Sequence, residues 1–329
     1  MLTMSGPSRA PATAANLVTE AGWQEPEVES RGGSRVWPLR RAWRPIVQAA
    51  LALGPVTLRA GDSLCRLVQR VPLRSPGSPG RDVLANSGDG LEMDSTGLAC
   101  GMATQSRSAD GRARLGFAFF DHQGHAVLNV DLGDNASPDG FHDIVRSFSP
   151  SVADNARLDR DEPGQRSATS GHGVAAWAWL AQHRSVARLD ILLERRAEAD
   201  LAEPLPCDAI LEVLRHACHA RIPMTASFAS HGLRMGWTGS LLELGGRAGL
   251  AFARGPDTEL HWCEAGAGAQ AWLVREPTSF GLVQSVALLA PDGGLRLHLQ
   301  PAADGATPQP CAWRAAINTA RGGPCGAAC

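Results

Sequence analysis

The sequence has 329 residues, 44 % of them hydrophobic, which is enough for a large core in one or two domains. A formal net charge of −2 argues against an extended surface for nucleic acid or anionic lipid. All 31 basic residues are arginine and tyrosine is absent, which excludes a Schiff-base lysine and a tyrosinate metal ligand.

The two ends of the chain differ in composition from the rest. Residues 1–35 are polar and punctuated by Gly and Pro without a basic-then-apolar signal pattern, so a disordered leader is expected there. Residues 321–329 end in Cys325 and Cys329 and predict a frayed tail. No apolar run approaches the roughly 20 residues of a membrane span. The eight cysteines include no CxxC pair, which favours reduced thiols and a cytoplasmic location.

In the first part of the chain, Leu39–Leu53 carries apolar residues at helical spacing and is stopped by Gly54. Val56–Val71 is expected to form a pair of strands. Leu115–Asp131 is an apolar run, an Asp-His-Gln-Gly turn and a return strand with Ala126, Leu128 and Val130 on one face, which predicts a hairpin. Phe141–Phe148 follows as a short helix.

Residues 151–170 are charged, broken by Gly and Pro, and are expected to be a linker. Gly173–Arg195 is expected to be helical. Asp208–Arg221 is the cleanest amphipathic helix, with Asp208 as its N-cap. Strands dominate from Ile222 until a closing helix near Trp313.

The segment Ala271–Gln300 predicts three antiparallel strands, the last two joined at a Pro-Asp-Gly-Gly turn. In the third strand the residues Leu295, Leu297 and Leu299 share one face, and Arg296, His298 and Gln300 share the other.

The segment 115–131 is a weaker copy of 271–300, and each copy precedes a short helical segment. This repetition predicts an α+β protein made of two duplicated halves, 36–150 and 171–320. Each half is expected to be a large antiparallel sheet with helices packed on it.

Several segments, in order, resemble the HemS/ChuX haemin-utilisation family of bacterial cytoplasmic haem-binding proteins. The resemblance is strongest at Trp272–Gly294, WLVREPTSFGLVQSVALLAPDGG, and at Phe119–Val130, FFDHQGHAVLNV. Leu39–Gly54 is similar to the family's opening helix, Leu260-His261 to its Leu-His element, and Arg188 to the arginine of its Val-Ser-Arg element. The resemblance implies a haem cleft between the halves, in proteins described as haem carriers or as haem-degrading factors.

The chain departs from the family at three positions of the implied pocket. Ala175 stands where an ungapped count places the axial histidine, and Ala99 lies near the position of an arginine on the opposite haem face. Glu276 replaces the lysine of the family's Lys-Pro-Thr motif, where its charge would repel a propionate.

Five residues are the candidates for holding haem. His172 lies between two glycines, three residues before Ala175, and is the first choice for the iron ligand. His183 is the second choice. Arg184 and Arg188 are four apart on a helix and can grip one propionate together. The candidate that lines the cleft from the sheet is His298. A solvated surface position is the alternative for each of the four helical-region residues.

No other motif supports a different chemistry. His216 and His219 share a helix face, but two ligands without a third do not make a tetrahedral metal site. The sequence contains no GxSxG, no glycine-rich phosphate loop and no HExxH.

Two hypotheses follow from the sequence. The first is a cytoplasmic haem-binding and haem-trafficking protein of bacterial iron acquisition, with a haem importer or a haem oxygenase as partner and no nucleic-acid partner. Haem breakdown would need an electron donor and an open distal face, and the sequence shows neither. The alternative is a diverged paralogue that kept the fold, lost haem and acts as an interaction or regulatory protein.

Overall fold

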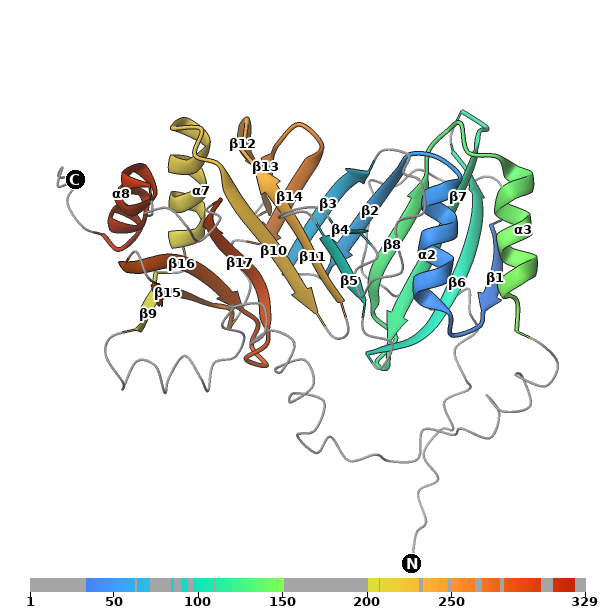
Figure 1. Ribbon diagram of the computed structural model, residues 1–329, viewed down its shortest axis with the longest axis horizontal. Coiled ribbons are helices and arrows are strands. Elements are labelled where there is room, and N and C mark those ends of the chain that lie inside the picture. Colours follow the sequence, from blue (N-terminus) through green and yellow to red (C-terminus); the bar gives the residue numbers. More distant parts are fainter. Residues whose placement is uncertain are drawn as a thin grey trace, which may run out of the picture.

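The structure is a computed structural model that describes residues 34–62, 64–71, 84–85, 90–93, 97–108, 110–150, 201–206, 208–230, 233–247, 250–263, 268–278, 281–302 and 310–322. The expected linker 151–170 and helix 173–195 lie outside the described residues, as do nearly all of the leader and tail. The described residues form two antiparallel sheets with helices at either end of the molecule (Figure 1).

The first sheet has nine strands in the order β1-β6-β7-β8-β2-β3-β14-β13-β12. Their bounds are β1 Arg35–Leu39, β2 Val56–Gly61, β3 Cys65–Val71, β6 Leu98–Arg107, β7 Ala113–Asp121, β8 Ala126–Leu132, β12 Glu243–Arg247, β13 Leu250–Arg254 and β14 Thr258–Cys263. The second sheet has eight strands in the order β4-β5-β11-β10-β17-β16-β15-β9. Their bounds are β4 Leu84–Ala85, β5 Gly90–Met93, β9 Ala202–Leu205, β10 Met224–Ser230, β11 Leu233–Gly239, β15 Gln270–Thr278, β16 Gly281–Leu289 and β17 Leu295–Pro301.

The two halves of the chain repeat one topology, as the sequence predicted. The order β1-β6-β7-β8-β2-β3 in the first sheet matches β9-β15-β16-β17-β10-β11 in the second. The turns agree as well, because Gly124 and Gly293 have φ values of 83° and 77° at equivalent places in the two hairpins. Pro38 and Pro204 occupy equivalent positions on the strands β1 and β9, opposite Met102 and Trp272. Proline is tolerated there because an edge strand has a free side that needs no ladder hydrogen bond.

Each sheet is completed by strands from the other half, which the sequence did not predict. Strands β12, β13 and β14 of the second half continue the first sheet by pairing with β3. Strands β4 and β5 of the first half continue the second sheet by pairing with β11. The sheets meet near the middle of the molecule, where β10 contacts β2 and β3. The halves are therefore interlocked.

Four helices are described, close to where the periodicity predicted them. They are α2 Trp43–Ala52, α3 Pro138–Phe148, α7 Ala209–His219 and α8 Cys311–Ala320. Helices α2 and α3 lie with the first sheet and α7 and α8 with the second (Figure 1). Helix α2 buries its apolar stripe, including Trp43, whose ring packs against Phe119 with centroids 5.8 Å apart. Trp313 of α8 donates from Nε1 to the carbonyl of Gln284 at 2.8 Å.

The caps of two helices differ in kind. The expected N-cap of α7, Asp208, holds that position, but its side chain makes no capping hydrogen bond, so the side-chain role inferred from its residue type was wrong. Helix α3 is capped by Ser137, whose hydroxyl accepts a hydrogen bond from the Gly140 amide at 3.2 Å. Pro138 follows the cap in the first turn of the helix. A serine cap followed by proline at the first helical position explains why α3 begins at Pro138.

The Ser137 cap gives a small and specific prediction. Ser137→Ala is expected to lower the free energy of unfolding by about 1 kcal/mol, because the Gly140 amide loses its acceptor. Urea denaturation followed by circular dichroism measures this change. Ser137→Asp keeps an acceptor and is expected to stay close to wild type. Equal losses in both variants would contradict the capping role.

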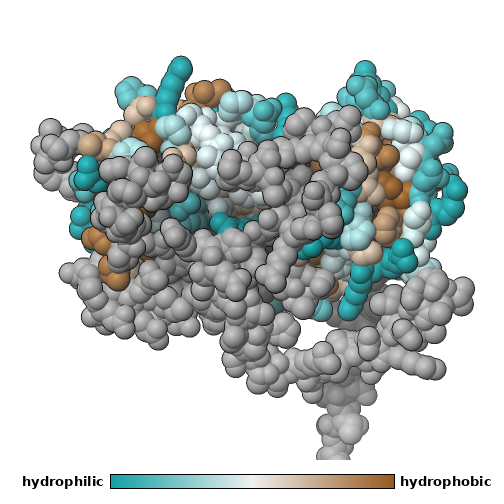
Figure 2. All heavy atoms as spheres, in the orientation of Figure 1, coloured by the Kyte–Doolittle hydropathy of each residue, from teal (hydrophilic) through white to brown (hydrophobic). Residues whose placement is uncertain are grey.

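The described residues contain no helix that is both long and apolar enough to cross a membrane. On the face shown in Figure 2, their surface mixes hydrophilic and apolar groups. Among them, Leu242 and Leu282 are the most exposed large apolar side chains.

Candidate functional site

The candidate site is the face of the second sheet that is turned away from α7 and α8. The leucines Leu297 and Leu299 of β17 face the helices and belong to the main core. The opposite face was expected to be simply polar, but it is buried as well, with Arg296 and His298 exposed by only 9 % and 2 %. This face therefore holds charged and polar groups away from water, where each of them needs a partner.

His298 lies in the middle of this face. It is directly opposite Ala287 on β16 and Ser227 on β10, so all three side chains project to the same side. Its Nε2 atom has no hydrogen-bond partner among the described residues. Burial, and secondly the positive charge of Arg234, lower the pKa of His298 to about 4. The imidazole is therefore neutral at pH 7 and able to donate a hydrogen bond or to ligate a metal.

A second buried polar group lies close to His298. Ser285 precedes the facing residue Ala287 by two positions on β16, so its side chain projects to the same side. The Ser285 hydroxyl is buried and has no hydrogen-bond partner within the part of the chain that the structure describes. On the other side of His298, the Arg234 guanidinium donates to the Ser227 hydroxyl at 3.5 Å. Polar groups thus extend across four strands, from β16 to β11.

The remainder of this face is apolar. Trp272 is opposite Ala287, and Val274 is opposite Ser285. With Leu289 on β16, these side chains are 3 % exposed or less. A flat aromatic and aliphatic area beside a few unsatisfied polar groups is the usual composition of a small-molecule site.

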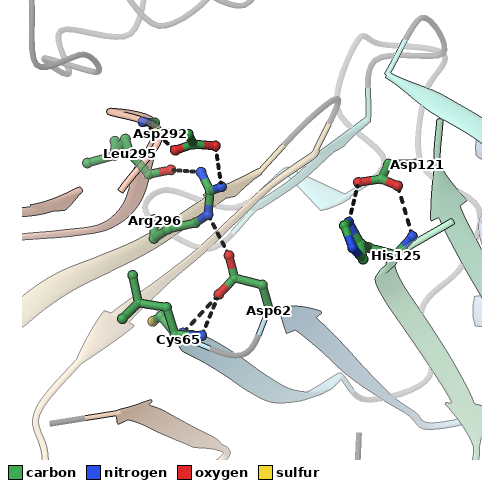
Figure 3. A network of polar contacts seen from close by, with 9 residues as sticks. Asp62, Cys65, Asp121, His125, Asp292, Leu295 and Arg296 are labelled. Carbon is green, nitrogen blue, oxygen red and sulfur yellow. Dashed lines mark hydrogen bonds and ion pairs between the residues drawn. The ribbon is translucent and has the colours of Figure 1, made fainter. Parts of the chain in front are cut away.

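A partly buried ion pair connects this face to the other half of the chain (Figure 3). Arg296 precedes His298 by two residues. Its guanidinium donates from Nε to the carboxylate of Asp62, which lies between β2 and β3, at 2.5 Å. Its Nη2 donates to Asp292 at 3.1 Å. Asp62 also accepts from the amides of Leu64 and Cys65 at 2.9 and 3.0 Å, which fixes the β2–β3 turn. The network ties the strand of His298 to the first sheet.

The sequence candidates are distributed unevenly over the structure. His298 lies in the described part, while His172, His183, Arg184, Arg188 and Ala175 lie outside the described residues. Their roles as an iron ligand and propionate clamp remain predictions. Glu276 lies in β15, where its backbone pairs with Val283 of β16.

The structure adds a residue near Ala99 that sequence spacing did not indicate. Arg41 precedes α2 and donates from Nε to the Ala99 carbonyl at 3.1 Å, across 58 residues of sequence. A guanidinium is therefore present beside the position where the sequence showed only alanine. Ser227 and Arg234 were missed too, although polar residues alternate with apolar ones along β10 and β11.

The histidine pair on α7 makes local contacts. The Nδ1 atom of His216 lies 3.1 Å from the Glu212 carbonyl one turn earlier. Within the described ranges, no three His, Cys, Asp or Glu side chains form a group that could hold a metal ion.

The fold can be compared with solved structures. The haem-bound form of PhuS, described as a heme-binding protein from Pseudomonas aeruginosa, matches with a TM-score of 0.70 and 22 % identity over 86 % of each chain. ChuS from Escherichia coli O157:H7, described as a heme degrading enzyme, matches with a TM-score of 0.67 and 22 % identity over 87 % of this chain and 86 % of its own. This chain has the fold of PhuS and ChuS. The family resemblance inferred from the motifs is confirmed at the level of the fold.

A second ChuS structure, described as an E. coli heme oxygenase, has a TM-score of 0.65 at 20 % identity and covers 87 % of this chain and 88 % of its own. No family model matches the sequence, and no curated protein matches it either. The fold has thus been retained with few sequence identities, which agrees with the altered residues at Ala99 and Glu276.

Proposed function

We propose that the chain is a haem-binding protein of the bacterial cytoplasm that receives imported haem and passes it on. The observation that carries the proposal is the shared fold over most of the chain with PhuS, whose haem-bound form is the matching structure. Because that likeness covers both halves, it includes the surfaces between which the family resemblance implies that haem is held.

The chemistry of the described face supports haem as the ligand. Haem is a flat apolar ring with an iron centre and two acidic side chains. The apolar area around Trp272 and Val274 suits the ring. The neutral imidazole of His298, whose Nε2 has no hydrogen-bond partner among the described residues, is able to bind the iron or to donate a hydrogen bond to one of the acidic side chains.

We assign four further roles on the family resemblance. His172 is the iron ligand, with His183 as the substitute if His172 does not serve. Arg184 and Arg188 together bind a propionate, since arginine forks match carboxylates. The bound haem would supply an iron centre, and the chain's own residues would hold and shield it.

Trafficking is favoured over breakdown as the activity. Breakdown would in addition require electrons and oxygen supplied from outside the chain. The haem importer would supply the ligand and a haem oxygenase would receive it.

A fold retained without haem is the second candidate. It is favoured by Ala175, which cannot bind iron at the position of the family's axial histidine, and by Ala99, which stands near the position of the family's arginine on the opposite haem face. Glu276, whose charge opposes a propionate, favours it too. In that case the chain would act as an interaction or regulatory protein.

A haemin titration of the purified chain tests the proposal. We expect a saturable one-to-one Soret band that His172→Ala abolishes or shifts, while His219→Ala, on the exposed end of α7, leaves it unchanged. A band that survives His172→Ala would move the ligand to His183, which the matching variant then tests. Absence of saturable binding by the wild-type chain would refute the haem function and support the second candidate.

A further inference from the structure

The end strands of the two sheets differ in how they are protected from pairing with another chain. Strands β1 and β9 each carry a proline, Pro38 and Pro204, and β4 is only two residues long. Proline and shortness are common means by which proteins block an exposed edge. Strand β12, Glu243–Arg247, ends the nine-stranded sheet beyond β13 (Figure 1), has five residues and contains no proline. Among the described strands it pairs with β13 alone, which leaves its other edge available to a further strand.

The residues at the start of this edge are open to solvent. Leu242, directly before β12, is 57 % exposed and the Glu243 side chain is 54 % exposed, although helix α7 also contacts β12. Gly245 in the middle of the strand keeps the edge flat, because the Phe252 ring of β13 lies where a side chain would begin, 2.6 Å from an added Cβ. An exposed apolar residue beside a flat edge without proline is typical of a strand that pairs with another chain.

The sequence of β12 is self-complementary in one antiparallel register. In a two-fold pairing centred on Gly245, Glu243 of one copy is opposite Arg247 of the other, and this pair occurs twice. Leu244 is opposite Gly246 of the second copy, so a large apolar residue meets an exposed glycine on both sides of the axis. Acid therefore meets base and large meets small in the same register, and opposite charges across a strand pair stabilise it.

We propose that β12 is a homodimerisation edge, at which two copies of the chain pair in the antiparallel register centred on Gly245. The occupant is a second copy because a two-fold axis brings the acidic end of this strand onto its own basic end. Pairing over five residues buries less area than a standard interface, so the dimer is weak and forms at micromolar concentration. The inference is independent of haem binding, and the haemin titration does not test it.

Sedimentation velocity of the full chain, with a thiol reductant present, measures the association. The wild-type chain is expected to change from one chain to two between about 1 and about 100 μM. Glu243→Arg and Arg247→Glu each place like charges opposite each other and should each raise the dissociation constant by about tenfold or more. Mixing the two variants creates only opposite-charge pairs and should restore the dimer. Arg35→Glu, on the proline-containing strand β1, is the matched control and should leave the association unchanged.

Each outcome supports or overturns the proposal. Folded single variants that stay monomeric alone and associate when mixed establish both the edge and its register. A wild-type chain that stays monomeric at about 100 μM, a dimer that persists in both single variants, or a mixture that fails to associate would overturn it.

A cross-link decides the case in which a charge reversal prevents folding. In the double variant Glu243→Cys/Arg247→Cys, oxidation should join position 243 of one copy to position 247 of the other. The two positions are about 13 Å apart within one strand, too far for a disulfide inside one copy. Peptide mass mapping that finds no such link would overturn the proposed register.

Discussion

Replacing Asp62 by alanine is expected to lower the free energy of unfolding by about 3 kcal/mol. The loss arises because the Arg296 side chain, only 10 % exposed, would keep a single carboxylate partner, and because the Leu64 and Cys65 amides would lose their acceptor. Urea denaturation followed by intrinsic tryptophan fluorescence measures the change.

An arginine with two carboxylate partners on the exposed surface provides the control. Arg254 also binds two carboxylates, Glu243 and Glu259, but its side chain is 47 % exposed. Glu243→Ala should therefore cost less than about 1 kcal/mol, as is usual for surface ion pairs. The double variant Asp62→Ala/Arg296→Met should regain part of the loss, because no buried cation remains. Similar losses in Asp62→Ala and Glu243→Ala would contradict the importance of burial.

Lowering the pH from about 6.5 to about 4 is expected to cost the folded state about 3 kcal/mol through His298 alone. Its pKa falls from 6.5 to about 4 on folding, first because of burial and then because of Arg234, and each unit corresponds to about 1.4 kcal/mol. In this window the unfolded chain binds the proton and the folded chain does not. The free energy of unfolding is therefore unaffected by His298 protonation above pH 6.5, and it decreases as the pH falls towards 4.

The comparison of His298→Leu with wild type isolates this effect. Stability curves of both proteins from pH 7.5 to pH 4 should converge or cross as the pH falls, because the variant has no group to protonate at this position. Leu297→Val, a neighbouring core change on the same strand, should differ from wild type by the same amount at every pH. A pH-independent difference between His298→Leu and wild type would mean that the imidazole is not desolvated.

The local elements and the duplication could be predicted from the sequence because they depend on short-range rules. A turn glycine between an apolar run and an alternating return strand specifies the β7–β8 and β16–β17 hairpins, and both turn glycines adopt positive φ. Helical spacing of apolar residues specified α2 and α7. The sequence missed β1, because five residues containing a proline carry little periodic signal.

The candidate site could be predicted only in part. His298 was identified from its strand, but its neighbours Ser227 and Arg234 lie about 71 and 64 positions away, and no spacing rule relates them to it. The family motifs directed attention to residues 172–188, since their order along the chain matches, and the described structure neither supports nor contradicts those assignments.

The sequence by itself thus determined the two hairpins, the described helices, the repeat of two halves and the resemblance to haem-utilisation proteins, because each is encoded in neighbouring residues. Only the tertiary structure decided that β4–β5 and β12–β14 cross into the opposite sheet. Only the tertiary structure also shows that the polar face of β17 is buried, with Arg296 paired to Asp62. Among the described residues it leaves His298 Nε2 without a hydrogen-bond partner. Pairing between strands and burial depend on which distant surfaces meet, and that is a property of the whole folded chain.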